Sequence, residues 1–558
     1  MKGYHSKVLV NGVPVQDTPR SVTVVNQAFM KDTGANNIED ALKYSSGVYS
    51  GQFGFDTRGD WTAVRGLSAS KYLDGLRRAY GFYNSAKPNP YALEQIEVLK
   101  GPSSVLYGQS EIGGIINAVS KRPEEEQQGE LWTQIGSYDR TQVATDVTGP
   151  VTEDGDLLYR FVGLRRESGT QMDFTENNGY LLAPSVTWKP TDDTELTLLF
   201  NRQVNEGAVS TMFLPQEGTL DPGPEGQIDP STFIGEPWWD RYDREKTEVT
   251  LFLKQRLAEK WQLKATARDS NSRGETREHW AAIGNGYNPD GTLDRTIFTA
   301  DRTTDVTNFD MRVEGQFDLG PTWHNLAVGV DYQDALWTED NYFYGFAAGG
   351  SIDPYDPEYG NLQRGVLNPT DRTDNAIEQT GVYVIDHMEI GNTIVSTALR
   401  RDDAENREIN PNSANEVSED DATTGRIGLM YRFDFGASPY VSYSESFSPN
   451  LGTDGAGGTL DPTTGEQTEA GIKFLSNRKD LAVNLARFDI EQENRVQQSG
   501  IPGGVSQTGA VVEGWEAQLK KQWSRFNLVV NYTSLDARDE SADTRLSNVV
   551  EDQGSVWG

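Results

Sequence analysis

The gaps between candidate strands after residue 128 constrain the fold of this 558-residue chain more than any other feature, because they alternate between very short and very long. Seventeen stretches alternate apolar and polar residues with the period of two that is typical of β-strands. They are 129–136, 139–149, 156–168, 178–189, 194–203, 245–256, 260–271, 305–317, 321–334, 376–388, 391–401, 422–434, 438–448, 467–475, 479–490, 509–522 and 524–535. The tight gaps are 150–155, 190–193, 257–259, 318–320, 389–390, 435–437, 476–478 and 523. The long polar gaps are 204–244, 272–304, 335–375, 402–421, 449–466 and 491–508.

This alternation indicates an up-and-down antiparallel sheet, because only that topology places all short connections at one rim and all long connections at the other. Short turns opposite long loops are typical of barrels in the bacterial outer membrane. A tilted strand crosses a membrane with about 9–11 residues, and the predicted strands are of that order. The sequence therefore predicts an all-β transmembrane barrel. A large soluble β-sandwich or propeller is the alternative.

The individual strands support this prediction, because each has two different faces. In the stretch 422–434 the apolar set is Ile427, Leu429, Tyr431 and Phe433, and the set between them is Arg426, Gly428, Met430 and Arg432. One face suits lipid and the other suits water. Such a sheet must close on itself, since lipid offers no hydrogen-bond partners to an open edge.

Composition limits the remaining classes. The mean hydropathy is −0.62 and no run of 18 apolar residues occurs, which excludes a helical membrane protein. The chain has no cysteine, so it has no disulfide and no thiolate metal site. A net charge of −34 makes nucleic acid an improbable partner. Acidic loops such as 402–405 and 419–421 suit either divalent ions or a solvated surface.

The first 128 residues predict a separate small α/β domain. Residues 18–25 form a candidate strand, and residues 37–44 form a candidate short helix with an Asn at its start and a turn at Gly47. Strand and turn patterns follow at Arg65-Gly66 and at 72–76.

Two later segments carry a family resemblance. They are LEQIEVLKGPSSVLYG at 93–108 and GGIINAVSKRP at 113–123, and further matches follow at 159–161, 183–190, 440–449 and 469–473. Together they resemble the TonB-dependent outer-membrane receptors, in the ferric-siderophore branch and close to its hydroxamate receptors. The resemblance implies a plug domain at 1–128 inside a transmembrane β-barrel at 129–558, which in the family has 22 strands and of which about 17–18 are present here.

The seventeen strands, with the start of another at 555–558, are fewer than the family's number, and a closed bacterial barrel has an even number. We therefore expect that the chain is truncated at its C-terminus and that it would not form a stable transporter alone. Met1 to Val15 shows neither a secretory signal nor a convincing segment for TonB to pair with, so we also expect an incomplete start.

The resemblance implies a receptor that binds a ferric siderophore at the outer face and imports it with energy from the TonB complex. Its surroundings would be outer-membrane lipid and lipopolysaccharide. We expect no enzymatic activity, because the sequence has no zinc, phosphate-loop or nucleophile motif and its four histidines form no cluster. We also expect no resident cofactor or protein-bound metal, since the siderophore itself surrounds the iron.

The candidate ligand-binding residues are aromatic and arginine side chains in two plug loops and in the outer loops. Aromatic rings bury a large apolar area of a ligand, and Tyr and Trp also offer a polar group for hydrogen bonding. Tyr83 is the foremost, since it falls where hydroxamate receptors place a ligand-contacting tyrosine. The other plug candidates are Phe53, Phe55, Arg58, Trp61, Arg78 and Tyr80. The outer-loop candidates are Trp238, Trp239, Tyr242, Trp280, Tyr342 and Tyr344. The alternative is that these aromatics only pack the plug against the barrel.

A second group follows from the resemblance alone. The family pairs basic plug residues with glutamates of the inner wall, and the matching positions are Arg65, Lys100, Glu469 and Glu516. Lys100 stands where an arginine is common. We expect these four residues to latch the plug to the wall, and an ordinary polar lumen is the alternative.

Other functions also fit a barrel with long loops. A passive binding or adhesion module, or a receptor used by phage or bacteriocin, would present the same loops to a partner. A receptor of the same fold for cobalamin, a nickel chelate or haem is a further alternative. Haem is disfavoured, because the region of 447–449 lacks a neighbouring histidine.

Overall fold

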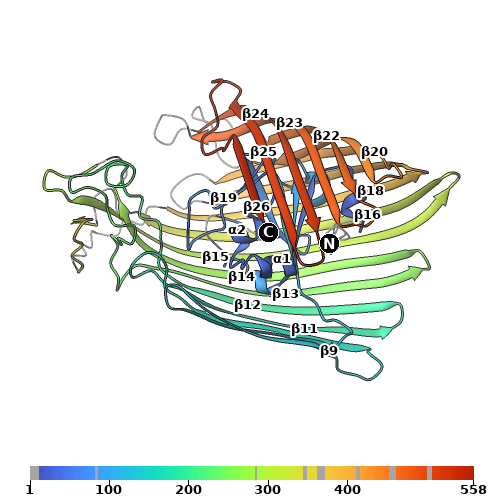
Figure 1. Cartoon of the computed structure of the whole chain (residues 1–558), viewed down its shortest axis with the longest axis horizontal. Coiled ribbons are helices and arrows are strands. Elements are labelled where there is room, and N and C mark those ends of the chain that lie inside the picture. The colour runs from blue at the N-terminus through green and yellow to red at the C-terminus, as the bar shows by residue number, and fades with distance from the viewer. Residues whose placement is uncertain are drawn as a thin grey trace.

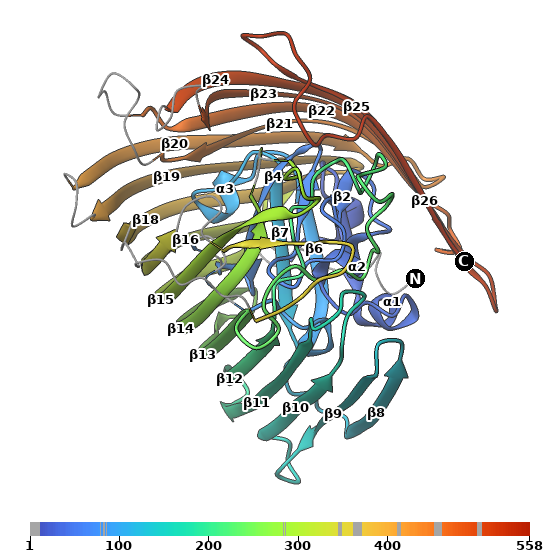
Figure 2. The ribbon, with the colours of Figure 1, turned by 90° about the vertical axis from the view of Figure 1, so that its left-hand side faces the viewer.

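The computed structural model describes residues 12–78, 80, 81, 84, 86–282, 284, 286–343, 349–360, 371–409, 415–450, 460–498 and 505–558. A large curved antiparallel sheet, the wall, surrounds a smaller domain, the plug (Figure 2). The long connections of the wall gather at the left end in Figure 1, and its short turns lie at the right end. Among the described residues, no helix is long and apolar enough to cross a membrane.

In its described residues the plug is a mixed sheet with three short α-helices. Its strand order is β1-β6-β7-β4-β3-β2, with β5 paired to β4 and with β4 and β7 parallel. The strands are β1 Val22–Asn26, β2 Val48–Ser50, β3 Thr62–Val64, β4 Leu67–Leu73, β5 Leu76–Arg77, β6 Leu93–Lys100 and β7 Gly114–Ser120. The helices are α1 Gln27–Asp32, α2 Ile38–Leu42 and α3 Ser104–Tyr107, with 3-10 turns η2 Val15–Asp17 and η3 Pro90–Ala92.

The helix at 37–44 is present as α2, and its start has the predicted cause. The side chain of Asn37 accepts a hydrogen bond from the backbone N–H of Asp40 at 2.7 Å, which satisfies a donor that the first helical turn leaves open. The strand predicted at 18–25 is wrong in its first half. It begins only at Val22, and residues 15–21 contact the wall instead.

Two tight hairpin turns, at the two ends of β4, position charged plug side chains. Arg65-Gly66 joins β3 to β4, and Asp74-Gly75 joins β4 to β5, with the flanking residues paired across each turn. All four residues have positive φ, the conformation of a two-residue type I′ hairpin. A positive φ is unfavourable for the first residue of each turn and free for the glycine, so tertiary contacts must hold Arg65 and Asp74 there.

The wall contains nine strands from β8 to β16 and nine from β18 to β26, eighteen in all within the described residues. The predicted presence of about 17–18 strands is therefore confirmed for this chain. The first nine are β8 Gln128–Gly136, β9 Arg140–Pro150, β10 Leu157–Glu167, β11 Asn177–Thr191, β12 Thr194–Gly207, β13 Arg241–Ala258, β14 Trp261–Ala281, β15 Leu293–Leu319 and β16 Thr322–Phe343. The others are β18 Asp371–Ile390, β19 Thr393–Ile409, β20 Glu416–Tyr431, β21 Ala437–Ser448, β22 Thr463–Leu475, β23 Leu481–Gln498, β24 Val505–Gln522, β25 Asn527–Asp539 and β26 Asp552–Trp557. The two-residue β17, Ser351–Ile352, pairs with the outer end of β15.

Several predicted long loops are shorter than expected, because the strands continue beyond the predicted ends. Strand β15 begins at Leu293 rather than 305, and β16 continues to Phe343 rather than 334. These extensions remain paired residue by residue, from Phe298–Phe343 to Leu319–Thr322. Their sequence lacks the apolar alternation because no lipid face is needed outside the membrane, whereas backbone pairing continues regardless.

The two predicted faces of the wall are present. In β20, Ile427 and Leu429 are exposed toward the outside, while Arg426 and Met430 are buried inside. The wall order runs from β10 to β26 and on through β8 to β9 as a closed barrel. Paired residues are defined from β8–β9 through to β25–β26, and none are defined between β26 and β8 in the described part of the chain. At that seam the plug covers the wall, with the Phe29 and Trp557 rings in edge contact at 5.0 Å.

Candidate functional site

The structure brings the four predicted latch residues together in one buried cluster. Arg65 is fully buried, and its guanidinium lies 2.7 Å from carboxylate oxygens of both Glu469 on β22 and Glu516 on β24. Lys100, at the end of β6, forms an ion pair with the other oxygen of Glu516. The plug thus contributes two cations to this cluster and the wall two anions, and each buried charge has a partner.

Neutral groups complete the latch. Arg65 donates to the Gln467 side chain at 2.6 Å and lies over the Phe488 ring at 4.1 Å, while Lys100 donates to the Ser46 hydroxyl at 2.9 Å. Burial lowers the pKa of Lys100, and the Glu516 carboxylate opposes that shift. The Arg65-Gly66 turn aims the arginine outward from the plug sheet, which explains why a strained backbone is kept at this position.

The plug loop between β2 and β3 presents some of the predicted ligand residues and buries others. Phe53 and Phe55 are exposed, and the ring of Phe53 lies edge-on to Trp61 at 5.4 Å. Arg58 is buried, and it forms an ion pair with Asp56 at 2.9 Å. We therefore place the aromatic rings at the surface of this loop and the Asp56–Arg58 pair beneath it.

Three further candidates lie between plug and wall. Tyr80 is buried and donates to Gln333 of β16 at 2.9 Å, and its ring is 6.2 Å from that of Trp337. Tyr242 of β13 is buried and donates to the carbonyl of Arg58 at 3.3 Å. Arg78 donates to the carbonyl of Ala86 at 3.1 Å. For Tyr80 the packing alternative describes its contacts better than ligand binding does.

The outer-loop candidates are spread over separate places. Trp238 is exposed, whereas Trp239 packs against the buried His279 with ring centroids 4.9 Å apart. Trp280 lies between Phe213 and Phe298, at 6.0 and 5.8 Å. Tyr342 is partly buried near the outer end of β16. Tyr83 and Tyr344 lie outside the described residues.

A cavity of about 440 Å³ opens at the outer end between the plug and strands β8–β13. Of the predicted ligand residues, Phe55 and Tyr242 line it. The other lining residues that bear on ligand binding are Tyr138, Arg140, Arg166, Glu39 and Asn89, none of which was predicted. Tyr138, Arg140 and Arg166 lie beside the short connections β8–β9 and β10–β11, so the long polar gaps gave no signal for them.

Glu39 lies beneath the aromatic loop and is nearly fully buried. It accepts a hydrogen bond from the backbone N–H of Trp61. Burial raises the pKa of Glu39 to about 7, and the neighbouring Asp60 adds to the shift. The support of the loop therefore includes a carboxyl group that changes charge near neutral pH.

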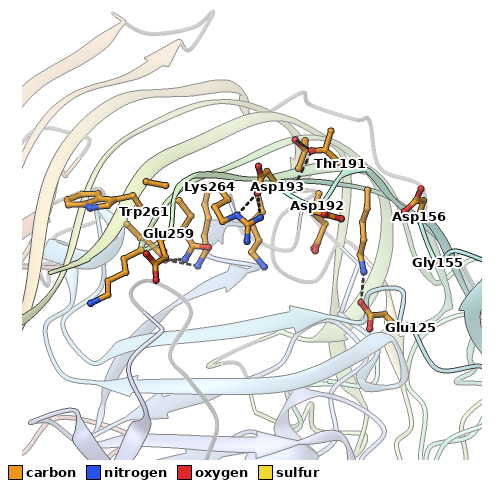
Figure 3. A pocket seen from close by; sticks show the side chains of 18 of the residues that line it. Glu125, Gly155, Asp156, Thr191, Asp192, Asp193, Glu259, Trp261 and Lys264 are labelled. Atoms are coloured by element: carbon orange, nitrogen blue, oxygen red, sulfur yellow. Dashed lines mark hydrogen bonds and ion pairs between the residues drawn. The ribbon is translucent and has the colours of Figure 1, made fainter.

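Two more cavities lie on the inner side of the wall, one along strands β9–β16 and the other between the plug and strands β12–β18. One of about 970 Å³ lies at the short-turn end, and Asp156, Asp193, Glu259 and Lys264 are among the side chains that line it (Figure 3). The other, of about 160 Å³, reaches Leu106 and Tyr107 of the plug. Both are lined by Glu195, Lys254 and Lys264, so they adjoin.

A further buried plug–wall ion pair, between Arg268 and Asp74, is not evident from the sequence. Arg268 of β14 lies 3.1 Å from the carboxylate of Asp74 and donates to the carbonyl of Leu73 at 2.8 Å. Asp74 also accepts hydrogen bonds from the backbone and side chain of Ser120. The Asp-Gly turn was the available signal, but its partner 194 residues away could not be read from spacing.

Comparison with known proteins agrees with this architecture. The family model for the TonB dependent receptor-like β-barrel matches residues 187–558, and the model for the TonB-dependent receptor plug domain matches residues 14–115. The ferrioxamine B receptor of Salmonella typhimurium is 31% identical over 489 residues, which are 86% of this chain and 68% of that protein. The ferrichrome outer membrane transporter/phage receptor of Escherichia coli is 28% identical over 98% of this chain and 77% of its own length.

Solved structures show the same fold. The ferripyoverdine receptor of Pseudomonas aeruginosa, bound to ferripyoverdine, superposes with a TM-score of 0.88 at 22% identity, over 99% of this chain and 76% of that one. The chain therefore belongs to the TonB-dependent receptors, and its place is the bacterial outer membrane.

Proposed function

We propose that this chain imports a ferric siderophore of the hydroxamate kind, using energy transmitted by TonB. The observation that carries the proposal is the division of the plug surface. Its outer end presents the aromatic rings of Phe53 and Phe55 beside a cavity, while its flank is held to the wall by the buried Arg65 latch. Binding at one surface and release at another are what an energised gate requires.

The cargo class is supported by the relatives, which are named as ferrioxamine and ferrichrome receptors. A chelate already surrounds its iron, so the protein needs to offer rings and hydrogen bonds rather than metal ligands. The outer cavity combines both kinds of group, since Phe55 and Tyr138 line it together with Arg140 and Asn89. In this proposal the protein carries no resident cofactor and makes or breaks no bond in its cargo.

The surroundings follow from the same proposal. Exposed aromatic side chains near the short-turn rim, including Phe433, Phe435, Trp523 and Phe526, suit the boundary between hydrocarbon and water. We place lipopolysaccharide and outer-membrane lipid against this outward face. TonB would act from the opposite side to the aromatic loop, on the N-terminal side of the plug.

Growth under iron starvation tests the proposal. A strain without its own siderophore receptors, expressing this protein, is given ferric hydroxamate, catecholate and citrate-type chelates, with and without TonB. We expect rescue by a hydroxamate chelate only when TonB is present. Rescue by none of the iron chelates would contradict the proposal and favour another metal complex as cargo.

A further inference from the structure

Residues Val15–Ser21 form a strap that precedes β1 and lies against the inner face of strands β20–β22. The ammonium group of Lys473 on β22 donates to the carbonyl of Val15 at 2.6 Å and to that of Thr18 at 2.7 Å. Lys473 is almost fully buried, so these hydrogen bonds are shielded from water. The Val15 side chain is also buried, in a cluster that includes Tyr383 and Ile385 of the wall.

The middle of the strap fits closely against a glycine of the wall. A Cβ atom placed on Gly428 of β20 would lie only 2.6 Å from the ring of Pro19, so this position has no room for a side chain. Arg426, two residues earlier on β20, donates to the Pro19 carbonyl at 3.4 Å. In contrast, a Cβ atom on Gly425 of the same strand would meet nothing closer than 3.5 Å.

The end of the strap shares a wall residue with the latch. The backbone N–H of Ser21 donates to one carboxylate oxygen of Glu469 at 2.7 Å, and Arg65 lies 2.7 Å from the other oxygen. Tyr440 donates to the same oxygen as Ser21, also at 2.7 Å. Glu469 therefore joins the strap to the fully buried Arg65 ion pair between plug and wall.

We propose that the strap is the release catch of the plug, with Lys473 as the residue that positions it. A pull from the N-terminal side breaks the Lys473, Pro19 and Ser21 contacts one after another rather than all at once. Departure of the strap removes a donor from Glu469 and admits water beside the Arg65 pair, and water weakens a buried ion pair. This inference rests on the proposed energised transport, since it states where that energy acts first.

Cysteine labelling tests the catch without any transport assay, because the chain has no native cysteine. Val15→Cys places a thiol in the buried face of the strap, and its maleimide labelling from the periplasmic side reports departure of the strap. We expect Gly428→Ala to raise the labelling rate about tenfold, while Gly425→Ala keeps it within about twofold. Equal rates for these two variants would overturn the proposal.

Two further variants test whether Lys473 holds the strap, and they provide the test if Gly428→Ala does not form a heat-resistant barrel. Lys473→Met removes both hydrogen bonds at similar length, so it should raise Val15→Cys labelling about tenfold, while Lys473→Arg should keep it slow. Unchanged labelling in Lys473→Met would contradict the assigned role.

Coupling to the latch needs a second thiol. Ser46→Cys lies beside Lys100, within the latch and away from the strap. Gly428→Ala should raise labelling of this thiol as well, and an unchanged Ser46→Cys rate would show that the strap moves without opening the latch. No siderophore is present in these measurements, so their outcome is independent of whether the cargo proposal holds.

Discussion

The plug meets the two halves of the wall in different ways. Against β20–β25, which we call the packed half, the plug is joined by the Arg65 and Lys100 ion pairs and by the strap contacts of Lys473. Against β8–β16, the open half, Arg268–Asp74 and Lys121–Asp146 are the corresponding buried pairs, and all three cavities described above lie mainly on this side. The packed half fixes the plug, and the open half gives it space.

The turns at the two ends of strand β4 contact the two halves of the wall, and the surroundings of their charged residues differ. The Arg65-Gly66 turn faces two carboxylates in a dry surrounding, whereas the Asp74-Gly75 turn faces the buried Arg268 and the partly exposed Arg122 next to a cavity. Removing one partner of a dry, fully paired cluster leaves an uncompensated buried charge, which is costly. Removing one partner of a pair beside a water-accessible cavity should cost less stability, because water replaces part of the lost interaction.

The largest effect is expected on the packed half. Glu469→Ala removes the acceptor shared by Arg65, Ser21 and Tyr440, and should destabilise docking of the plug by about 3–5 kcal/mol. Protease digestion of the plug in isolated outer membranes measures this change. Glu466→Ala is the matched control, because Glu466 lies on the same strand but is exposed. Equal digestion of the two variants would mean that the latch does not hold the plug.

The second effect lies under the aromatic loop. Burial raises the pKa of Glu39 to about 7, so its contribution to stability is present below its ordinary pKa of 4.5 and is lost as pH rises through 7. Between pH 5 and pH 8 the loop should therefore lose about 2 kcal/mol of stability. Glu39→Gln keeps an acceptor for Trp61 and should remove most of this pH dependence.

Hydrogen exchange of residues 51–61, corrected for its intrinsic pH dependence, measures the effect of Glu39. Glu94→Gln is the control, since Glu94 is an exposed glutamate of the same domain. If Glu39→Gln and the unmodified protein keep the same pH dependence, the assigned ionisation of Glu39 is wrong.

A smaller loss of stability is expected from breaking the Arg268–Asp74 ion pair on the open half. Arg268→Met removes hydrogen bonds to Leu73 and Asp74, but Asp74 keeps the backbone and hydroxyl of Ser120 as donors. The cost should be about 1–2 kcal/mol, below that of Glu469→Ala. The same digestion assay compares the two halves, with Arg273→Met on the exposed side of β14 as control. A loss as large as that of Glu469→Ala would remove the distinction between packed and open halves.

The smallest effect concerns the ligand surface itself. Phe53→Ala deletes an exposed ring that lies edge-on to Trp61, so the fold should be unaffected. Affinity for a ferric hydroxamate should fall by about 1 kcal/mol. Quenching of protein fluorescence on titration measures it, and Leu220→Ala, an exposed apolar residue elsewhere in the outer loops, is the control. Unchanged affinity would move the ligand away from this loop.

The sequence predicted the strands well, because a residue such as Ile427 must face lipid and its neighbour Arg426 must face the lumen. It predicted the strand ends less well at β15 and β16, where pairing continues beyond the lipid and leaves no apolar signal. Among site residues, family resemblance selected Arg65, Lys100, Glu469 and Glu516, and these meet in the structure. Aromatic content alone selected Tyr80 and Trp280, which pack against other side chains.

The sequence by itself determined which residues of each wall strand face lipid and which face the lumen. It also determined the alternation of short turns and long loops, and the tight turns of the plug. Each of these features depends on residues that are neighbours in the chain. The tertiary structure decided the partners of buried charges. Arg268 and Asp74 are 194 positions apart, and Lys473 and Val15 are 458 apart. Such pairs form because a buried charge or carbonyl is stable only when it is hydrogen-bonded or paired. The fold supplies the partner from a distant part of the chain, and no local sequence pattern predicts which residue it is.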